Sequence, residues 1–213
     1  MSSAKEYENY TGSLLEVYFA SLGMVTVRIR RSLRFRSERG FRSYSPIIDI
    51  SVGPFSETRG ASLWGQYDSL VHFSKGMIDD MLVQFRQNYE DFGHGFFRIE
   101  ERTLPTSYRD FLSQSQGVNW NARCFLAIEV EDSGSPKHLL GDMINVSIAG
   151  RIGLVIGYNQ PKYETLLRQL DYIAYSVEAK KIKFNSKNIL VLKPDQFENA
   201  IVNNLPPESE DSH

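Results

Sequence analysis

The sequence contains one cysteine, Cys124, among its 213 residues. No disulfide can therefore form within the chain, and an unpaired thiol in an apolar run suits a reducing compartment. Long hydrophobic runs are also lacking, and residues 1–6 show no positive segment followed by an apolar one. We therefore expect neither a signal peptide nor a membrane span, and we expect a cytoplasmic protein that has no membrane partner.

The chain also lacks a strong excess of charge of either sign. Its 24 basic and 26 acidic residues give a formal charge of −2, which provides no global attraction to nucleic acid. With 41% hydrophobic and 23% charged residues, the composition is typical of a folded globular protein. We expect a single domain over residues 1–205 and a disordered acidic tail over 206–213.

Histidines are few, and the usual nucleotide-binding motifs are missing. The four histidines are scattered without zinc-ligand spacing: His72, His94, His138 and His213. No Gly-Lys-Ser/Thr phosphate loop and no Gly-x-Gly-x-x-Gly after a strand is present. Structural zinc and dinucleotide binding are therefore disfavoured.

The hydrophobic pattern predicts alternating strands and helices. Residues 124–131, 138–149 and 153–158 indicate a strand–helix–strand unit, whose strands should be parallel with a right-handed crossover. Period-two and apolar runs predict further strands over 25–30, 45–52 and 189–192, and helical spacing predicts helices over 11–23, 66–89, 161–177 and 195–203. We expect an α/β fold with a central mixed sheet flanked by helices and a long helical insertion over about 60–121, of which 91–121 shows no clear period.

Acidic residues interrupt two of the apolar strands. Asp49 lies between two isoleucines, and Glu129 and Glu131 are two residues apart, which puts both glutamates on one face of their strand. If these strands are neighbours, the three carboxylates crowd together, and Mg²⁺ or Mn²⁺ would relieve their repulsion. Such a metal could ionise a water and neutralise phosphate charge, with Lys137 orienting the water. The alternative is that these acids form the solvated face of an edge strand.

The order of these features resembles that of the restriction-endonuclease-like PD-(D/E)XK nuclease superfamily. The resemblance spans about 11–192 and rests on a helix, a strand with Pro-x-x-Asp ending at Asp49, and a later strand ending in Glu-x-Glu. It implies metal ligation by Asp49, by Glu129 and by the backbone carbonyl of Val130. It also implies that Glu16, on the first predicted helix, is an additional acid near the metal, although a solvated helix residue would look the same.

The resemblance departs from the family pattern at one catalytic position. Glu131 stands where the family most often has a lysine, and Lys137 on the following helix is the candidate replacement. His138, the next residue, is a further candidate for proton transfer. Two functions stay open: a metal-dependent nuclease whose catalytic residues are Asp49, Glu129, Glu131 and Lys137, and an inactive nuclease-like module that binds nucleic acid or a partner protein.

A basic segment lies between residues 28 and 42. Its seven arginines and one glutamate carry a formal charge of +6. Arginine binds phosphates in bidentate geometry, so we expect this segment to bind nucleic acid, DNA in the first instance, through Arg28, Arg30, Arg31, Arg34 and Arg36. A solvated hairpin face paired with acids elsewhere is the alternative. The predicted helix 66–89 offers a surface for a homodimer or for a larger assembly.

Overall fold

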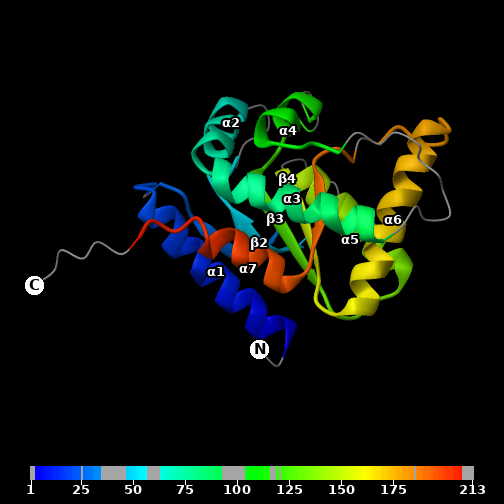
Figure 1. Ribbon diagram of the computed structural model, residues 1–213, viewed down its shortest axis with the longest axis horizontal. Coiled ribbons are helices and arrows are strands. Elements are labelled where there is room, and N and C mark those ends of the chain that lie inside the picture. Colours follow the sequence, from blue (N-terminus) through cyan, green and yellow to red (C-terminus); the bar gives the residue numbers. More distant parts are fainter. Residues whose placement is uncertain are drawn as a thin grey trace, which may run out of the picture.

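The computed structural model describes residues 3–24, 26–34, 47–56, 63–92, 104–115, 119, 121–184 and 186–207. Within these residues, one five-stranded sheet with the order β1-β2-β3-β4-β5 is flanked by seven helices (Figure 1). The strands are β1 (Ile29–Arg34), β2 (Ile47–Val52), β3 (Cys124–Glu131), β4 (Gly150–Gly157) and β5 (Ile189–Leu192). The first three strands pair antiparallel and the last three pair parallel, so the predicted mixed α/β sheet is confirmed.

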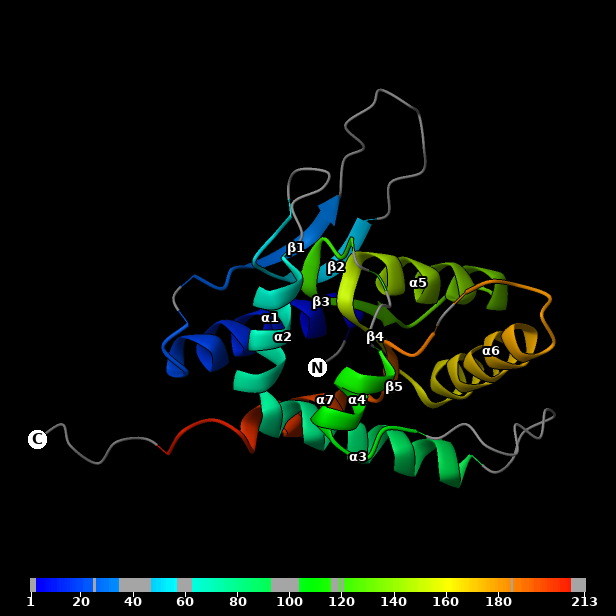
Figure 2. The same cartoon turned by 90° about the horizontal axis from the view of Figure 1, so that it is seen from above.

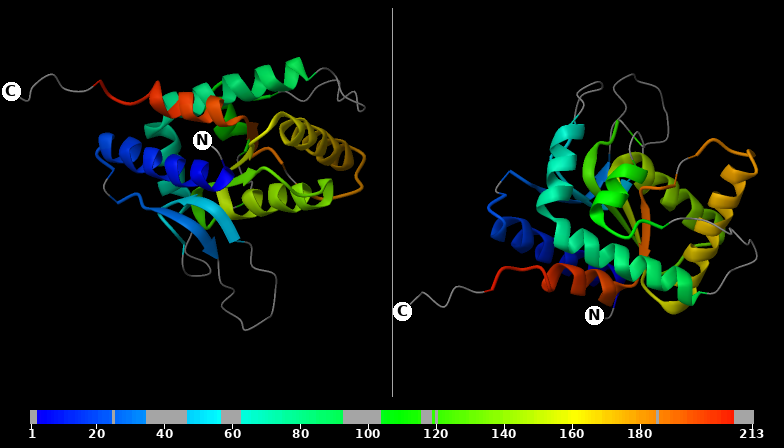
Figure 3. Two further views of the ribbon diagram at one scale, coloured as in Figure 1. Left: turned by 90° about the horizontal axis from the view of Figure 1, so that it is seen from below. Right: turned by 45° about the horizontal axis from the view of Figure 1, so that its top comes forward.

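The helices cover both faces of the sheet. They are α1 (Ala4–Ser21), α2 (Trp64–Phe73), α3 (Lys75–Asp91), α4 (Tyr108–Gln114), α5 (Pro136–Ala149), α6 (Gln160–Glu178) and α7 (Pro194–Val202). Helices α5 and α6 lie beside each other on one side of the sheet, and α1, α3 and α7 lie on the other (Figure 2). Helix α7 also packs along α1, so both ends of the chain's described part lie on that second side (Figure 3).

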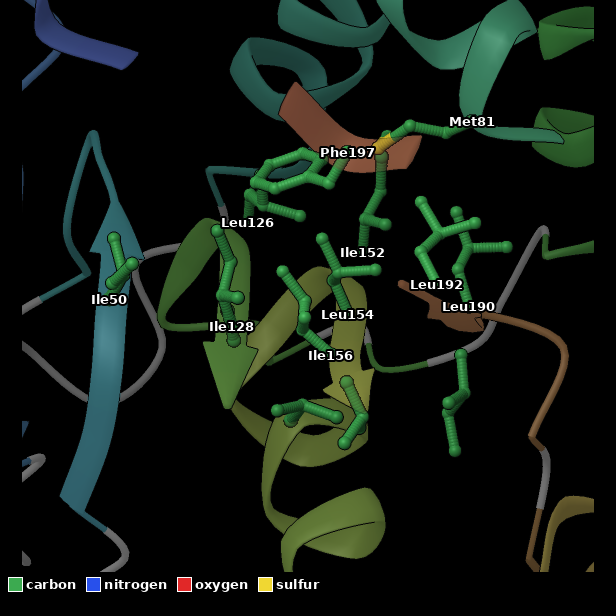
Figure 4. Packing of buried hydrophobic residues seen from close by; sticks show 14 of the residues in the cluster. Ile50, Met81, Leu126, Ile128, Ile152, Leu154, Ile156, Leu190, Leu192 and Phe197 are labelled. Atoms are coloured by element: carbon green, nitrogen blue, oxygen red, sulfur yellow. The ribbon is translucent and has the colours of Figure 1, made fainter. Parts of the chain in front are cut away.

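Strand β3 is the central strand, and all eight of its residues are buried. Side chains on both faces of the central strands belong to the apolar core. Figure 4 shows side chains of β3 and β4 pointing toward Phe197 of α7 and Met81 of α3: Leu126, Ile128, Ile152 and Leu154. The intervening residues of β3, including Glu129 and Glu131, face the opposite side, where α5 packs.

Helix α5 approaches the sheet closely because β4 carries a glycine beneath it. A Cβ placed on Gly153 would lie 2.9 Å from Val146 of α5. Gly153 pairs with Ala127 of β3, so both central strands carry a small residue at this point. The close packing brings the polar residues of the first half of α5 toward the carboxyl end of β3.

Several predicted element boundaries are wrong. The predicted helix 66–89 is two helices separated at Ser74, whose hydroxyl donates a 2.7 Å hydrogen bond to the carbonyl of Leu70. The first helix begins at Ala4, where the hydroxyl of Ser3 accepts from the amide of Glu6. The predicted strand 25–30 is displaced to Ile29–Arg34, because the amide of Val27 bonds to the carbonyl of Met24 in a turn.

Other expectations concern segments near the limits of the described residues. The helices α2, α3 and α4 occupy the predicted insertion between β2 and β3. The predicted tail over 206–213 lies beyond the last described residue, 207, except for its first two positions. Among the helices of the described part, none combines the length and the apolar character that crossing a membrane requires.

Candidate metal centre

Asp49 and Glu129 lie side by side on neighbouring strands. Strand β2 pairs with β3 so that Ile50 is opposite Ile128, which places Asp49 opposite Glu129 on the adjacent position of the same ladder. The Asp49 carboxylate accepts a 3.0 Å hydrogen bond from the backbone amide of Val130. The two acids that the sequence predicts as metal ligands are therefore in contact, and the predicted edge-strand alternative is wrong for β3, which is central and buried.

The environment of Glu129 strongly favours its neutral form. Its residue exposure is 5%. Burial, which is the largest cause, together with the negative charge of Asp49 and a hydrogen bond to it, raises the pKa of Glu129 to about 11. Without a cation, Glu129 holds a proton at neutral pH and is hydrogen-bonded to Asp49. A metal ion bound between Asp49 and Glu129 would replace this proton and would also relieve the repulsion between the two carboxylates.

A second acidic pair lies next to the first. Glu131 follows Glu129 on the same strand face, and Asp142 of α5 faces it. Burial raises the pKa of Glu131, and the charge of Asp142 and a hydrogen bond to it raise that pKa further. Burial also raises the pKa of Asp142, which the hydrogen bond from Glu131 partly offsets. The four carboxyl groups thus form two hydrogen-bonded pairs on one face of β2, β3 and α5.

These groups line one open cavity of about 750 Å³. Helix α1 adds Lys5 and Glu8, which form an ion pair at the cavity wall. Burial raises the pKa of Glu8, while its hydrogen bond with Lys5 lowers it. The lining residues from the strands, the β3–α5 connection and α5 are Arg34, Ile47, Asp49, Glu129, Val130, Glu131, Asp132, Ser133, His138, Asp142 and Asn145, and α1 also contributes Ala4.

Two of the predicted catalytic or metal-binding residues lie outside this cavity. Glu16 is half exposed, and its carboxylate is 3.8 Å from the guanidinium of Arg31. The acid that α1 supplies to the cavity is Glu8, two helical turns earlier. Lys137 is exposed at the start of α5 and does not line the cavity. The ammonium group that does line it belongs to Lys5.

The predicted arginines that the structure describes lie in different environments. Arg31 faces α1, where its guanidinium donates to the Asn9 carbonyl at 3.3 Å and to the Ser13 hydroxyl at 3.1 Å. Arg34 lines the cavity. Arg30 lies over the ring of Phe55, 4.5 Å from its centre. Arg28 is exposed just before β1, and Arg36 lies outside the described residues.

The arrangement offers several oxygen donors and one imidazole to a cation. Asp49, Glu129 and the backbone of Val130 form one group. Glu131, His138 and Asp142 form the other, and the donor atoms of this second group all lie within 4.8 Å of one another. Carboxylate oxygens are the ligands that Mg²⁺ and Mn²⁺ prefer. No protein-family model, curated protein or solved structure matches the chain.

Proposed function

We propose that this protein is a nuclease that depends on Mg²⁺ or Mn²⁺ and hydrolyses phosphodiester bonds of nucleic acid. The observation that carries the proposal is the contact of Asp49 with Glu129 in the wall of an open cavity, beside Glu131. Carboxyl groups that can be buried together only by holding protons are suited to exchange those protons for a divalent cation. This support comes from the site itself and is independent of the resemblance in motif order.

Asp49, Glu129 and the carbonyl of Val130 would hold the metal. In an extended strand, the amide and the carbonyl of one residue point to the same side, so the Val130 carbonyl faces β2 together with the amide that binds Asp49. A bound Mg²⁺ or Mn²⁺ would lower the pKa of a water and neutralise charge on the phosphate. Glu131, farther along the same strand face, would accept a hydrogen bond from that water and orient it.

The cationic side chains around the cavity favour a polyanionic substrate. Arg34 lines the cavity itself, and Arg28 is exposed farther back along the same segment. Lys5 brings an ammonium group to the wall from α1. A phosphate backbone that follows β1 would meet these groups in sequence before it reached the carboxylates. We therefore propose DNA as the first substrate to test. We also propose that Lys5, rather than Lys137, supplies the positive charge that orients the water.

A second candidate function has its own supporting observation. Glu131 stands where a lysine is expected, and Lys137 lies outside the cavity. In addition, the hydrogen-bonded pair of Asp49 and Glu129 satisfies its own polar groups when a proton takes the place of a cation. A protein with these properties could bind nucleic acid or a partner protein without cleaving anything.

Cleavage of supercoiled plasmid and of single-stranded DNA tests the proposal directly. With Mg²⁺ or Mn²⁺ we expect nicking that EDTA stops and that Asp49→Asn reduces by at least 100-fold. Glu16→Gln, an exposed acid on α1 outside the cavity, is the matched control and should cleave like the wild type. Undiminished cleavage by Asp49→Asn would reject this centre. Binding of DNA without cleavage by the wild type would favour the second function.

A further inference from the structure

We infer that Glu131, His138 and Asp142 form a second cation site, separate from Asp49 and Glu129, that prefers Mn²⁺, Co²⁺ or Zn²⁺ to Mg²⁺. The donor atoms of all three side chains lie within 4.8 Å of one another. The site's place in a reaction rests on the proposed function, but its occupancy by metal does not require cleavage. It combines two carboxylates with one imidazole, whereas the first group offers oxygen donors alone.

The spacing of two of these donors already matches that of ligands on one ion. The Oδ2 atom of Asp142 is 3.4 Å from Nε2 of His138. Two atoms that each lie about 2.1 Å from an ion, at octahedral or tetrahedral angles, are about 3.0–3.4 Å apart. Small movements of the third carboxylate, that of Glu131, would complete a three-ligand site with room for water in the open cavity.

An independent sign of a missing ligand is the state of Asp142. The residue is 8% exposed and lines the cavity. Its Oδ2 atom is fully buried and accepts no hydrogen bond from a nitrogen or hydroxyl donor of the described residues. The 3.4 Å contact with His138 is an ion pair only when the imidazole is protonated, and the hydrogen bond between Glu131 and Asp142 requires a proton that a cation would displace. A buried carboxylate oxygen without a partner is costly, and a bound ion is one of the few arrangements that satisfies it.

Local structure holds the three side chains in this arrangement. His138 and Asp142 are one turn apart on α5, so their side chains share a face of the helix. The hydroxyl of Ser135 caps the helix by accepting from the amide of His138. Gly134 has a φ of +88°, and a Cβ there would lie 3.0 Å from the His138 ring. The connection before α5 therefore packs against the imidazole and limits its movement.

The imidazole determines the expected preference among metals. Mg²⁺ binds nitrogen ligands poorly and retains water, whereas Mn²⁺, Co²⁺ and Zn²⁺ accept imidazole together with carboxylates. One oxygen of Glu131 would bind the cation and leave its second oxygen for a water in the cavity. The two groups of donors would thus be filled by different ions in a mixture of Mg²⁺ and Mn²⁺.

Metal titration of the purified full-length protein at about pH 8 tests the inference. We expect two Mn²⁺ ions per chain by electron paramagnetic resonance, of which excess Mg²⁺ displaces one. Co²⁺ should give a d–d absorption band from the site with the imidazole. His138→Ala should remove this band and weaken the binding of the second Mn²⁺ ion by at least tenfold. Lys137→Ala, the exposed neighbour on α5, is the matched control and should retain both properties.

The variants also separate this inference from the proposed function. Asp49→Asn should retain the Co²⁺ absorption band. It should no longer cleave nucleic acid, and it should no longer bind the Mn²⁺ ion that excess Mg²⁺ displaces from the wild type. If His138→Ala binds Co²⁺ with unchanged affinity and spectrum, the second site does not exist. If the wild type binds Co²⁺ through His138 but never cleaves nucleic acid, the second site stands and the nuclease proposal fails. Because the His138 side chain is 65% exposed, its removal should leave the fold intact, which circular dichroism can verify.

Discussion

The carboxylate of Asp49 on β2 accepts a hydrogen bond from the backbone amide of Val130 on β3, across 3.0 Å. This bond uses one oxygen of Asp49 as part of the sheet, so the side chain is fixed where the two strands separate at the cavity. The carboxylate of Asp49 also takes part in a hydrogen bond with Glu129. A ligand held by the backbone in this way is preorganised, because its orientation costs no further entropy when a cation binds.

The stability of the metal-free protein should fall as pH rises through the neutral range. Glu129 has a pKa of about 11 in the folded state and near 4.5 when it is exposed to water. Between these values the folded state holds a proton that the unfolded state lacks, so folding loses about 1.4 kcal/mol per pH unit from this group. Urea unfolding between about pH 6 and about pH 8, in the presence of EDTA, measures this slope.

Glu129→Gln provides the comparison for that slope. The carboxamide keeps a donor for Asp49 but has no proton to lose, so the variant should be less sensitive to pH than the wild type and more stable at about pH 8. Glu16→Gln, an exposed acid on α1, should retain the wild-type slope. Equal slopes for the wild type and Glu129→Gln would show that Glu129 is already ionised in the folded state.

Divalent cations should stabilise the protein, and more strongly at about pH 8 than at about pH 6. A cation must displace the protons that Glu129 and Glu131 hold, and this displacement costs less as pH rises. At a concentration 100-fold above the dissociation constant, the gain in unfolding free energy is about 2.7 kcal/mol. Thermal unfolding with Mn²⁺ or EDTA at both pH values tests this. The prediction would be contradicted if the cation stabilised the protein equally at both pH values. It would also be contradicted if the stabilisation persisted in a double variant of Asp49→Asn and His138→Ala.

Arg34 and Arg31 should differ in their contribution to nucleic-acid binding. Arg34 lines the cavity, whereas the guanidinium of Arg31 is bonded to the backbone and side chains of α1. In EDTA, which blocks cleavage, replacing Arg34 with alanine should weaken the binding of nucleic acid. It should also reduce the slope of the logarithm of the binding constant against the logarithm of the salt concentration by the contribution of about one phosphate contact. Arg31→Ala should leave the salt dependence unchanged. Fluorescence anisotropy with a short oligonucleotide over a range of salt concentrations, in EDTA, gives both slopes. If both variants behave alike, β1 does not read the phosphate backbone in this way.

Alternation in the sequence was sufficient to place part of the site. Alternation predicts that Glu129 and Glu131 share one face of their strand. Whether Asp49 joins them depended on the strands being neighbours, and the pairing of β2 with β3 meets that condition. The parallel pairing of β3 with β4 follows from the strand–helix–strand pattern. These features depend on local periodicity, which a single sequence contains.

The contributions of the helices could not be predicted in the same way. Asp142 reaches Glu131 because Gly153 lets α5 approach β4, and this close packing is a tertiary effect. On α1 the family resemblance implied Glu16, with a solvated helix residue as the alternative, whereas Glu8 is the acid on the face that turns toward the cavity. The only local signal for Glu8 was its helical spacing from the buried Thr11 and Leu15. Which acids of an amphipathic helix become buried depends on where that helix docks.

Arg151 should contribute more to stability than any exposed ion pair of this protein. Its side chain is completely buried, donates to Asp68 at 2.9 Å and to the hydroxyl of Ser115 at 2.8 Å, and stacks 4.2 Å from the ring centre of Trp64. It therefore connects β4 to α2 and to the end of α4. Arg151→Ala leaves a cavity and removes the hydrogen-bond donor of Asp68 and Ser115. We therefore expect a loss of about 3 kcal/mol in the free energy of unfolding.

Arg168→Ala is the matched control for this prediction, because Arg168 forms an exposed i,i+4 pair with Glu164 on α6. Exposed pairs of this kind contribute about 0.5 kcal/mol or less. Urea unfolding monitored by tryptophan fluorescence is suited to the comparison, since Trp64 stacks on Arg151 and its emission should shift in Arg151→Ala even under native conditions. A loss below about 1 kcal/mol in Arg151→Ala would show that the buried guanidinium barely recovers its desolvation cost, and that α2 and α4 are held to β4 by their apolar contacts instead.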